Sequence, residues 1–178
     1  MRVPVKAGRL GMRCAYVGLR VYWRVAKPTV VGVKCVVTND GDVLLVRHTY
    51  GHRAWDFPGG TVRRRELPID AARREMHEEL GRRIDGWEEI GALHLHAHHH
   101  RDNLHLFRAS IGDRNIDIDL IELAEAVWFA PDELPPDVGP FVGKILARVR
   151  LAGGLDRKSC GTESSHWRML REDAGSDA

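Results

Sequence analysis

The sequence predicts an α/β fold of the α+β type, in which a mixed β-sheet lies between helices. A β-branched run over Thr29–Val37 and an apolar run over Val43–Arg47 predict two neighbouring strands. An amphipathic stretch over Pro68–Leu80 predicts a helix, because its apolar residues cluster on one side at helical spacing. Later segments predict further strands and a second helix. Strands and helices are interspersed along the chain, which favours a mixed sheet.

The predicted strands have recognisable ends. Between the first two, Asn39-Asp40-Gly41-Asp42 consists of turn-forming residues and predicts a hairpin. The second strand is apolar almost throughout, which predicts that both of its faces are covered. Three more strands are expected over Ile90–His98, Leu104–Ile111 and Ala126–Phe129.

Proline and glycine delimit the helix over Pro68–Leu80. Pro68 is tolerated in the first turn, and Gly81 just past the last residue favours termination. Upstream, Phe57-Pro58-Gly59-Gly60 interrupts regular structure. A second helix is expected over Phe141–Leu151.

The length of 178 residues fits one domain with flanking segments. We expect a basic amphipathic helix within residues 1–28, a folded domain over 29–152 and a disordered polar tail over 153–178. Such a helix would pack on its own domain or on a second copy of the chain, which gives a homodimer. Contact with a membrane surface is the less favoured alternative.

Composition makes several classes of protein less plausible for this chain. The formal net charge of +2 is too near zero to predict nucleic-acid binding. Cys14, Cys35 and Cys160 are far apart and form no C-x-x-C pair, which favours a reducing compartment and a cytoplasmic location. No apolar run approaches the roughly 18 residues that a membrane span needs.

The first helix carries three glutamates close together. Glu75 and Glu79 border its apolar face, and Glu78 lies further round towards water. Carboxylates three and four residues apart repel one another by a few tenths of a kcal/mol per pair, and a bound cation removes that repulsion. Oxygen ligands of this kind suit hard cations such as Mg²⁺ or Mn²⁺, which also bind substrate phosphates.

A solvated acidic face is the alternative interpretation of these glutamates. Arg82 and Arg83 follow Glu78 and Glu79 by four residues, so each glutamate has an ion-pair partner within reach. On the helix alone the two interpretations are evenly matched.

The residues before the helix favour a functional site. Gly59 and Gly60 let the backbone approach a metal or a phosphate closely. Glu66 lies just before the helix, where it can fix Arg74 by an ion pair.

The whole segment resembles the signature of the Nudix hydrolase family, which is G-x5-E-x7-R-E-U-x-E-E-x-G-U with U a bulky apolar residue. Residues 60–82 read GTVRRRELPIDAARREMHEELGR and match every fixed position, and only the last apolar position differs, being Arg82. The flanking W-x-F-P-G-G and W-F…D-E-L-P also look like the family. The resemblance covers about Thr29 to Arg150 and implies an α/β/α sandwich.

The resemblance implies a metal-dependent pyrophosphohydrolase that uses Mg²⁺ or Mn²⁺. Its substrate would be a small-molecule nucleotide, a nucleoside diphosphate linked to another moiety. One alternative is a Nudix-fold nucleotide-binding sensor without catalysis, which the complete set of glutamates disfavours. The other is an RNA 5′-end pyrophosphohydrolase. The near-neutral charge gives this second alternative no support, so no nucleic-acid partner is expected.

Roles follow from matching positions in the family's pattern. Glu75 and Glu79 match the principal metal ligands, Glu78 matches a further ligand, and Gly59 matches the residue whose carbonyl meets the metal. Arg74 and Glu66 match the pair that orients the catalytic glutamate, so both are expected to serve catalysis with Glu75.

The general base is expected to be Glu75 or a glutamate outside the signature. In some members such a glutamate lies a few residues before a tryptophan. Glu122, upstream of Trp128, fits that place best, and Glu125 is the second choice.

Substrate-binding candidates lie in two loops. Arg63, Arg64 and Arg65 form a basic stretch, where the family often has Gly in place of Arg65, and either contact substrate phosphates or stay solvated. Arg47 and His48 precede the signature and are candidates for phosphate contact.

Two further features are less informative. Trp55 is a candidate for stacking on a base, although a core or hinge role is favoured. His94, His96 and His98 alternate along one predicted strand. They are expected to face solvent or substrate, and a transition-metal site is the less favoured reading.

Overall fold

A computed structural model describes residues 17, 29–51, 53–97 and 100–153 of the chain. The predicted N-terminal helix lies outside the described residues except at Val17, and the predicted tail except at Gly153. Both therefore stay predictions. Within the described ranges, every helix is too short or too polar to span a lipid bilayer.

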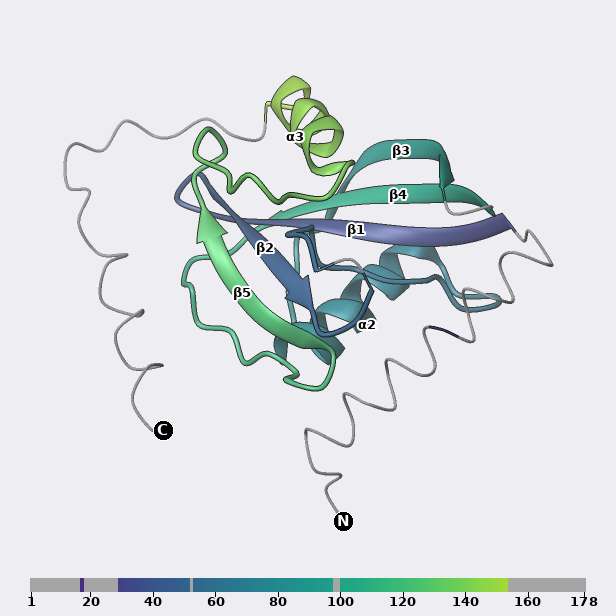
Figure 1. The fold of residues 1–178 in the computed structure, drawn as a ribbon, viewed down its shortest axis with the longest axis horizontal. Coiled ribbons are helices and arrows are strands. Elements are labelled where there is room, and N and C mark those ends of the chain that lie inside the picture. The colour runs from purple at the N-terminus through teal and green to yellow at the C-terminus, as the bar shows by residue number, and fades with distance from the viewer. Residues whose placement is uncertain (1–16, 18–28, 52, 98–99, 154–178) are drawn as a thin grey trace, which may run out of the picture.

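Five strands form one mixed sheet in the order β3-β4-β1-β2-β5 (Figure 1). β1 and β4 run parallel, whereas the other neighbouring pairs run antiparallel. The strands are β1 Thr29–Asn39, β2 Asp42–His48, β3 Glu88–Ala97, β4 His100–Ser110 and β5 Leu123–Phe129. The predicted mixed sheet is confirmed.

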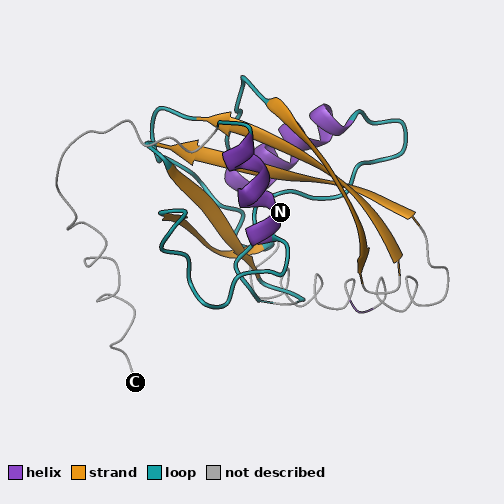
Figure 2. Ribbon diagram, turned by 90° about the horizontal axis from the view of Figure 1, so that it is seen from above, coloured by secondary structure: helices purple, strands orange, loops and turns teal. Residues whose placement is uncertain are grey.

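Among the described residues, one helix covers each face of the sheet (Figures 1 and 2). Helix α2 spans Pro68–Leu80, with the predicted bounds, and Gly81 closes it in the left-handed conformation at φ 62°. Helix α3 spans Val142–Leu151 on the opposite side. The arrangement is the predicted sandwich of helix, sheet and helix.

Each helix has its own apolar cluster, because successive strand residues point to opposite faces. Val33, Phe107 and Met76 belong to the cluster under α2, and Val36 and Ile145 to the cluster under α3. Residues 43–46 of β2 are all fully buried. This confirms that both faces of β2 are covered.

β1 and β2 diverge soon after their turn. They pair only at Thr38 with Val43 and at Asn39 with Asp42. The segment after β2 returns alongside β1 instead, where Val33 N–H donates to Gly60 O at 2.8 Å. Backbone groups of β1 that β2 leaves free are paired in this way, and the glycine pair is brought beside α2.

Candidate active site

Helix α2 presents its glutamates at different depths. Glu79 is 2% exposed and Glu75 9% exposed, whereas the side chain of Glu78 is 45% exposed. The apolar residues Met76 and Leu80 hold the helix on the sheet, so the two bordering carboxylates are carried inward. Their predicted positions on the helix are confirmed.

The two glycines bring the loop into contact with these carboxylates. Gly59 N–H donates to Glu79 Oε2 at 3.0 Å. Gly59 adopts φ 141°, and a Cβ there would lie 2.2 Å from Val33 O, so only glycine fits. A Cβ at Gly60 would lie 2.4 Å from the carboxyl group of Glu75. Both close approaches are therefore possible only because glycine has no side chain.

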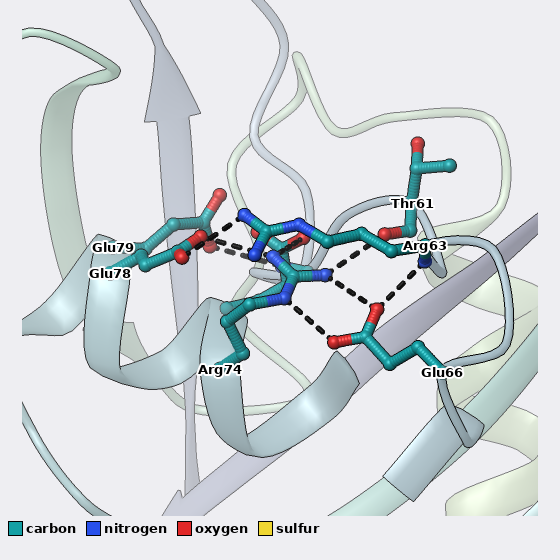
Figure 3. Close-up of polar contacts among 8 residues, drawn as sticks. Thr61, Arg63, Glu66, Arg74, Glu78 and Glu79 are labelled. Carbon is teal, nitrogen blue, oxygen red and sulfur yellow. Dashed lines mark hydrogen bonds and ion pairs between the residues drawn. The ribbon is translucent and has the colours of Figure 1, made fainter. Parts of the chain in front are cut away.

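Arg74 links the remaining glutamates of the site (Figure 3). Its Nε and Nη2 donate to the two oxygens of Glu66 at 2.8 and 3.0 Å, a bidentate pair that fixes the guanidinium plane. Its Nη1 reaches Glu75 Oε1 at 2.7 Å and Glu78 Oε2 at 3.0 Å. The predicted ion pair between Glu66 and Arg74 is present, and it extends to the helix carboxylates.

The alternative of a solvated acidic face predicts an ion pair between Glu78 and Arg82. Glu78 has other partners. Arg82 binds Asp113 instead, with Nη2 donating to Oδ2 at 2.8 Å. Glu78 pairs with Arg63 and Arg74. Glu66, Glu75 and Glu78 therefore all contact Arg74, which favours the site over the solvated face.

Burial and hydrogen bonding shift the pKa values of the three carboxyl groups in different directions. It raises the pKa of Glu79 to about 8, against the charge of Lys34 and the hydrogen bond from Gly59. Burial also raises the pKa of Glu75, which the hydrogen bond from Arg74 opposes. In Glu66 the hydrogen bond from Arg74 dominates and lowers the pKa to about 2.

Glu122 belongs to the same cluster of charges. Its carbonyl accepts a hydrogen bond from Thr49 N–H at 2.9 Å, which ties its loop to the end of β2. Burial raises its pKa, and repulsion from Asp119 and Glu75 adds to the effect. Glu125 instead faces Arg47, with Oε1 3.6 Å from Nε.

The carboxylates fit a hard divalent cation by their chemistry. Among the described residues, no three His, Cys, Asp or Glu side chains stand together as a ready metal-binding group. The donors are nevertheless all oxygens, which Mg²⁺ and Mn²⁺ prefer. A buried negative charge at Glu79 is unfavourable unless it is paired, so a cation at this place would stabilise it.

Arg47 and Trp55, both substrate candidates, contact each other. Arg47 Cζ lies 4.6 Å from the centroid of the Trp55 ring, and Nη2 donates to Asp137 Oδ2 at 2.7 Å. Trp55 is 5% exposed and packs edge-on against Phe129. The favoured core role of Trp55 is confirmed, and phosphate binding by Arg47 stays a prediction.

His48 is held in its neutral form. Burial, together with the smaller effect of the Lys34 charge, lowers its pKa to about 4. Its Nδ1 is buried and has no hydrogen-bond partner in the described part of the chain. At neutral pH this side chain can offer a phosphate a hydrogen bond but no positive charge.

Within the basic stretch, Arg63 contacts the site and Arg65 has an uncommon backbone conformation. Arg63 N–H donates to Glu66 Oε2 at 2.7 Å, and its guanidinium reaches Glu78 at 3.2 Å. Arg65 is exposed and adopts φ 67°, an uncommon value for a residue with a side chain.

In the histidine-rich strand β3, His94 is exposed and its Nδ1 lies 2.9 Å from Asn103 Oδ1. His98 lies outside the described residues.

Without divalent cations, stability is expected to depend on pH through Glu79. Its pKa is about 8 in the folded protein, against an ordinary value of 4.5. Between these values the folded state binds the extra proton, so the free energy of unfolding falls as pH rises. We expect the Tm of chelator-treated protein to drop from about pH 5 to about pH 8 more steeply than that of Glu79→Gln. Thermal melts at several pH values check this, and equal slopes would contradict it.

Comparisons with known proteins identify relatives of this chain. The family model for the NUDIX domain matches residues 28–149. The RNA pyrophosphohydrolase of Bartonella bacilliformis is 44% identical over 61 residues, which are 29% of this chain and 36% of that protein. The putative 8-oxo-dGTP diphosphatase of Bacillus subtilis is 32% identical over 104 residues, 58% of this chain and 68% of that protein.

A solved structure shares the fold. The MutT NUDIX hydrolase from Burkholderia pseudomallei superposes with a TM-score of 0.63 at 23% identity, covering 68% of this chain and 98% of that one. The match to the Bartonella protein spans only about a third of that protein's length, so the family rests on the match over residues 28–149. The chain belongs to the Nudix hydrolase family.

Proposed function

We propose that this protein hydrolyses the pyrophosphate linkage of a nucleoside diphosphate joined to another moiety, with Mg²⁺ or Mn²⁺ as cofactor. One observation carries the proposal. Two buried carboxylates, Glu75 and Glu79, lie against the backbone of the glycine pair Gly59 and Gly60, which gathers oxygen ligands of the kind that a hard cation prefers.

The side chains of the site have different roles, as metal ligands or as groups that position a ligand. Glu75 and Glu79 hold the cation, with Glu78 and the carbonyl of Gly59 as further ligands. When bound, the cation neutralises charge on the phosphate oxygens and makes a water easier to deprotonate. Arg74, itself fixed by Glu66, orients Glu75 through the 2.7 Å contact.

The base that accepts the water's proton is Glu75 or Glu122. Both have a raised pKa because of burial, which suits a group that must take up a proton near neutral pH. Arg63, which pairs with Glu78, and the exposed Arg65 contact the departing phosphate. Arg47 and His48 lie at the end of β2 and are second candidates for that contact.

Glutamine substitutions distinguish the two glutamates outside the signature. Glu122→Gln is expected to lower turnover by about 100-fold, the low end of what general-base catalysis contributes. Glu125→Gln is the matched control and is expected to change turnover less than about threefold, because Glu125 faces Arg47 and not the helix carboxylates. Single-turnover rates of the two variants give the answer. A larger loss in Glu125→Gln would contradict the assignment.

An RNA 5′-end pyrophosphohydrolase is the second candidate function. Relatives that bear this name support it, among them the Bartonella protein at 44% identity over 61 residues. The exposed side chains of Arg64 and Arg65 add support, because they can contact phosphates of a longer chain. A nucleotide-binding sensor is disfavoured because every carboxylate of the signature is present.

The homodimer through residues 1–28 stays a prediction.

A substrate panel tests the proposal. It contains ADP-ribose, diadenosine polyphosphates, nucleoside triphosphates, and capped and triphosphorylated RNA, each with Mg²⁺. The proposed function predicts phosphate-containing products from a nucleoside diphosphate derivative at a higher kcat/KM than from RNA. Faster release from triphosphorylated RNA would favour the second candidate. Tight binding without any product would favour the sensor.

A further inference from the structure

Lys34 interrupts an otherwise apolar part of β1. Its neighbours Val33, Cys35 and Val36 are fully buried, and its own side chain is only 16% exposed. An ammonium group in such surroundings is unfavourable unless it is paired and hydrogen-bonded. An aliphatic residue would pack here without that penalty, so packing alone does not explain the lysine.

The partners of Lys34 belong to the segment that leads into the active site. Its Nζ lies 2.8 Å from Asp56 Oδ2 and donates to the carbonyl oxygen of Phe57 at 2.7 Å. Asp56 Oδ1 in turn accepts the N–H of Phe57 at 2.8 Å. Lysine and aspartate therefore hold Phe57 by its C=O and by its N–H, which fixes its backbone against β1.

The backbone that follows Phe57 runs against β1 through Gly60 and on to Val62. Cys35 N–H donates to Pro58 O at 2.9 Å, and Val33 N–H donates to Gly60 O at 2.8 Å. Between these two bonds, Gly59 N–H donates to Glu79 Oε2 at 3.0 Å. The segment is thus fastened by Lys34 at its upstream end and meets the carboxylate of α2 at Gly59.

We propose that Lys34 is a positioning residue of the active site. With Asp56 it anchors the Phe57–Gly60 backbone, so that Gly59 faces Glu79. This inference rests on the proposed function, and Lys34 itself touches neither substrate nor cation. The effect is expected to be large, since a misplacement of about 1 Å in an active site costs on the order of 100-fold in rate.

Three variants test the inference in the full-length protein. Lys34→Met removes the ammonium group but keeps an unbranched side chain of similar length. Lys34→Arg keeps the charge and the donors. Lys144→Met is the matched control, because Lys144 is exposed on α3. The measurements are kcat and KM on the best substrate of the panel, the Mg²⁺ concentration for half-maximal rate, and amide hydrogen exchange in residues 33–37 and 57–60.

We expect Lys34→Met to lower kcat by about 10- to 100-fold with little change in KM. It should also raise the Mg²⁺ requirement and speed amide exchange in the Phe57–Gly60 segment. Lys34→Arg should recover part of the lost kcat, and Lys144→Met should match the wild-type protein. Should Lys34→Met fail to fold, Asp56→Asn is the second variant, with the same expected loss in kcat.

The outcomes separate this inference from the proposed function. A folded Lys34→Met with the kcat of Lys144→Met would overturn the inference while the proposed function stands. A loss confined to KM would also overturn it, because Lys34 would then contact the substrate. If the wild-type protein cleaves nothing in the panel, the proposed function fails. Unchanged amide exchange would still overturn the anchoring role in that case, and faster exchange would support it.

Discussion

Replacing Glu79 or Glu75 by glutamine is expected to lower single-turnover hydrolysis by several orders of magnitude. Both carboxylates are buried beside the glycine pair, where electrostatic attraction to a cation is little screened by water. Glutamine keeps the shape of the side chain and removes its charge. The loss is therefore expected to lie in the range seen when charge stabilisation or an activated water is removed.

Control variants show whether the loss of rate is specific to the two buried glutamates. Glu78→Gln is expected to cost less, because its side chain is 45% exposed. Glu133→Gln, in the exposed turn after β5, should leave the rate unchanged. All variants should stay folded, and the metal-free Tm of Glu79→Gln should rise at neutral pH, because folding no longer requires a carboxylate to take up a proton. Near-normal rates in both Glu75→Gln and Glu79→Gln would mean that α2 does not carry the chemistry and would contradict the proposed site.

Excess EDTA is expected to reduce hydrolysis to the background rate. The carboxylates offer only oxygen ligands, and charge on the pyrophosphate has to be neutralised in the transition state. Addition of Mg²⁺ or Mn²⁺ beyond the chelator should restore the rate. The control is EDTA already saturated with Mg²⁺, which should have no effect. Full activity in excess free EDTA would exclude a role for a dissociable divalent cation.

Helix α2 was predictable from local sequence to the residue. Pro68 suits the first turn, Gly81 provides the left-handed residue after the last, and the apolar residues between them recur at helical spacing. The depth of Glu75 and Glu79 relative to Glu78 follows from the same spacing. Local rules were sufficient here because each feature acts within one or two turns of the helix.

Strand ends and long-range contacts were harder to predict from the sequence. β5 begins at Leu123, three residues before the predicted start at Ala126, because pairing with β2 continues past a register shift at Arg47 and His48. The return of the segment after β2 alongside β1 was not predicted either. It depends on backbone hydrogen bonds between distant residues, which leave no periodic pattern in the sequence.

The site residues divide in the same way. The ion pair of Glu66 and Arg74 was predictable because the two lie eight residues apart around the start of a helix. The choice between Glu122 and Glu125 required the fold, since only the structure shows that Glu125 faces Arg47. Lys34 went unnoticed, although one charged residue inside an apolar strand was a signal that could have found it.

The most direct test of the account is the thermal stability of the wild-type protein and of Glu79→Gln, each with and without Mg²⁺. A ligand that binds only the folded state raises Tm, and the rise grows with the ratio of ligand concentration to Kd. The account predicts that Mg²⁺ raises the Tm of the wild-type protein and has little effect on Glu79→Gln, in which hydrolysis is also lost. Equal Mg²⁺-induced shifts in the two proteins, with equal rates of hydrolysis, would contradict it.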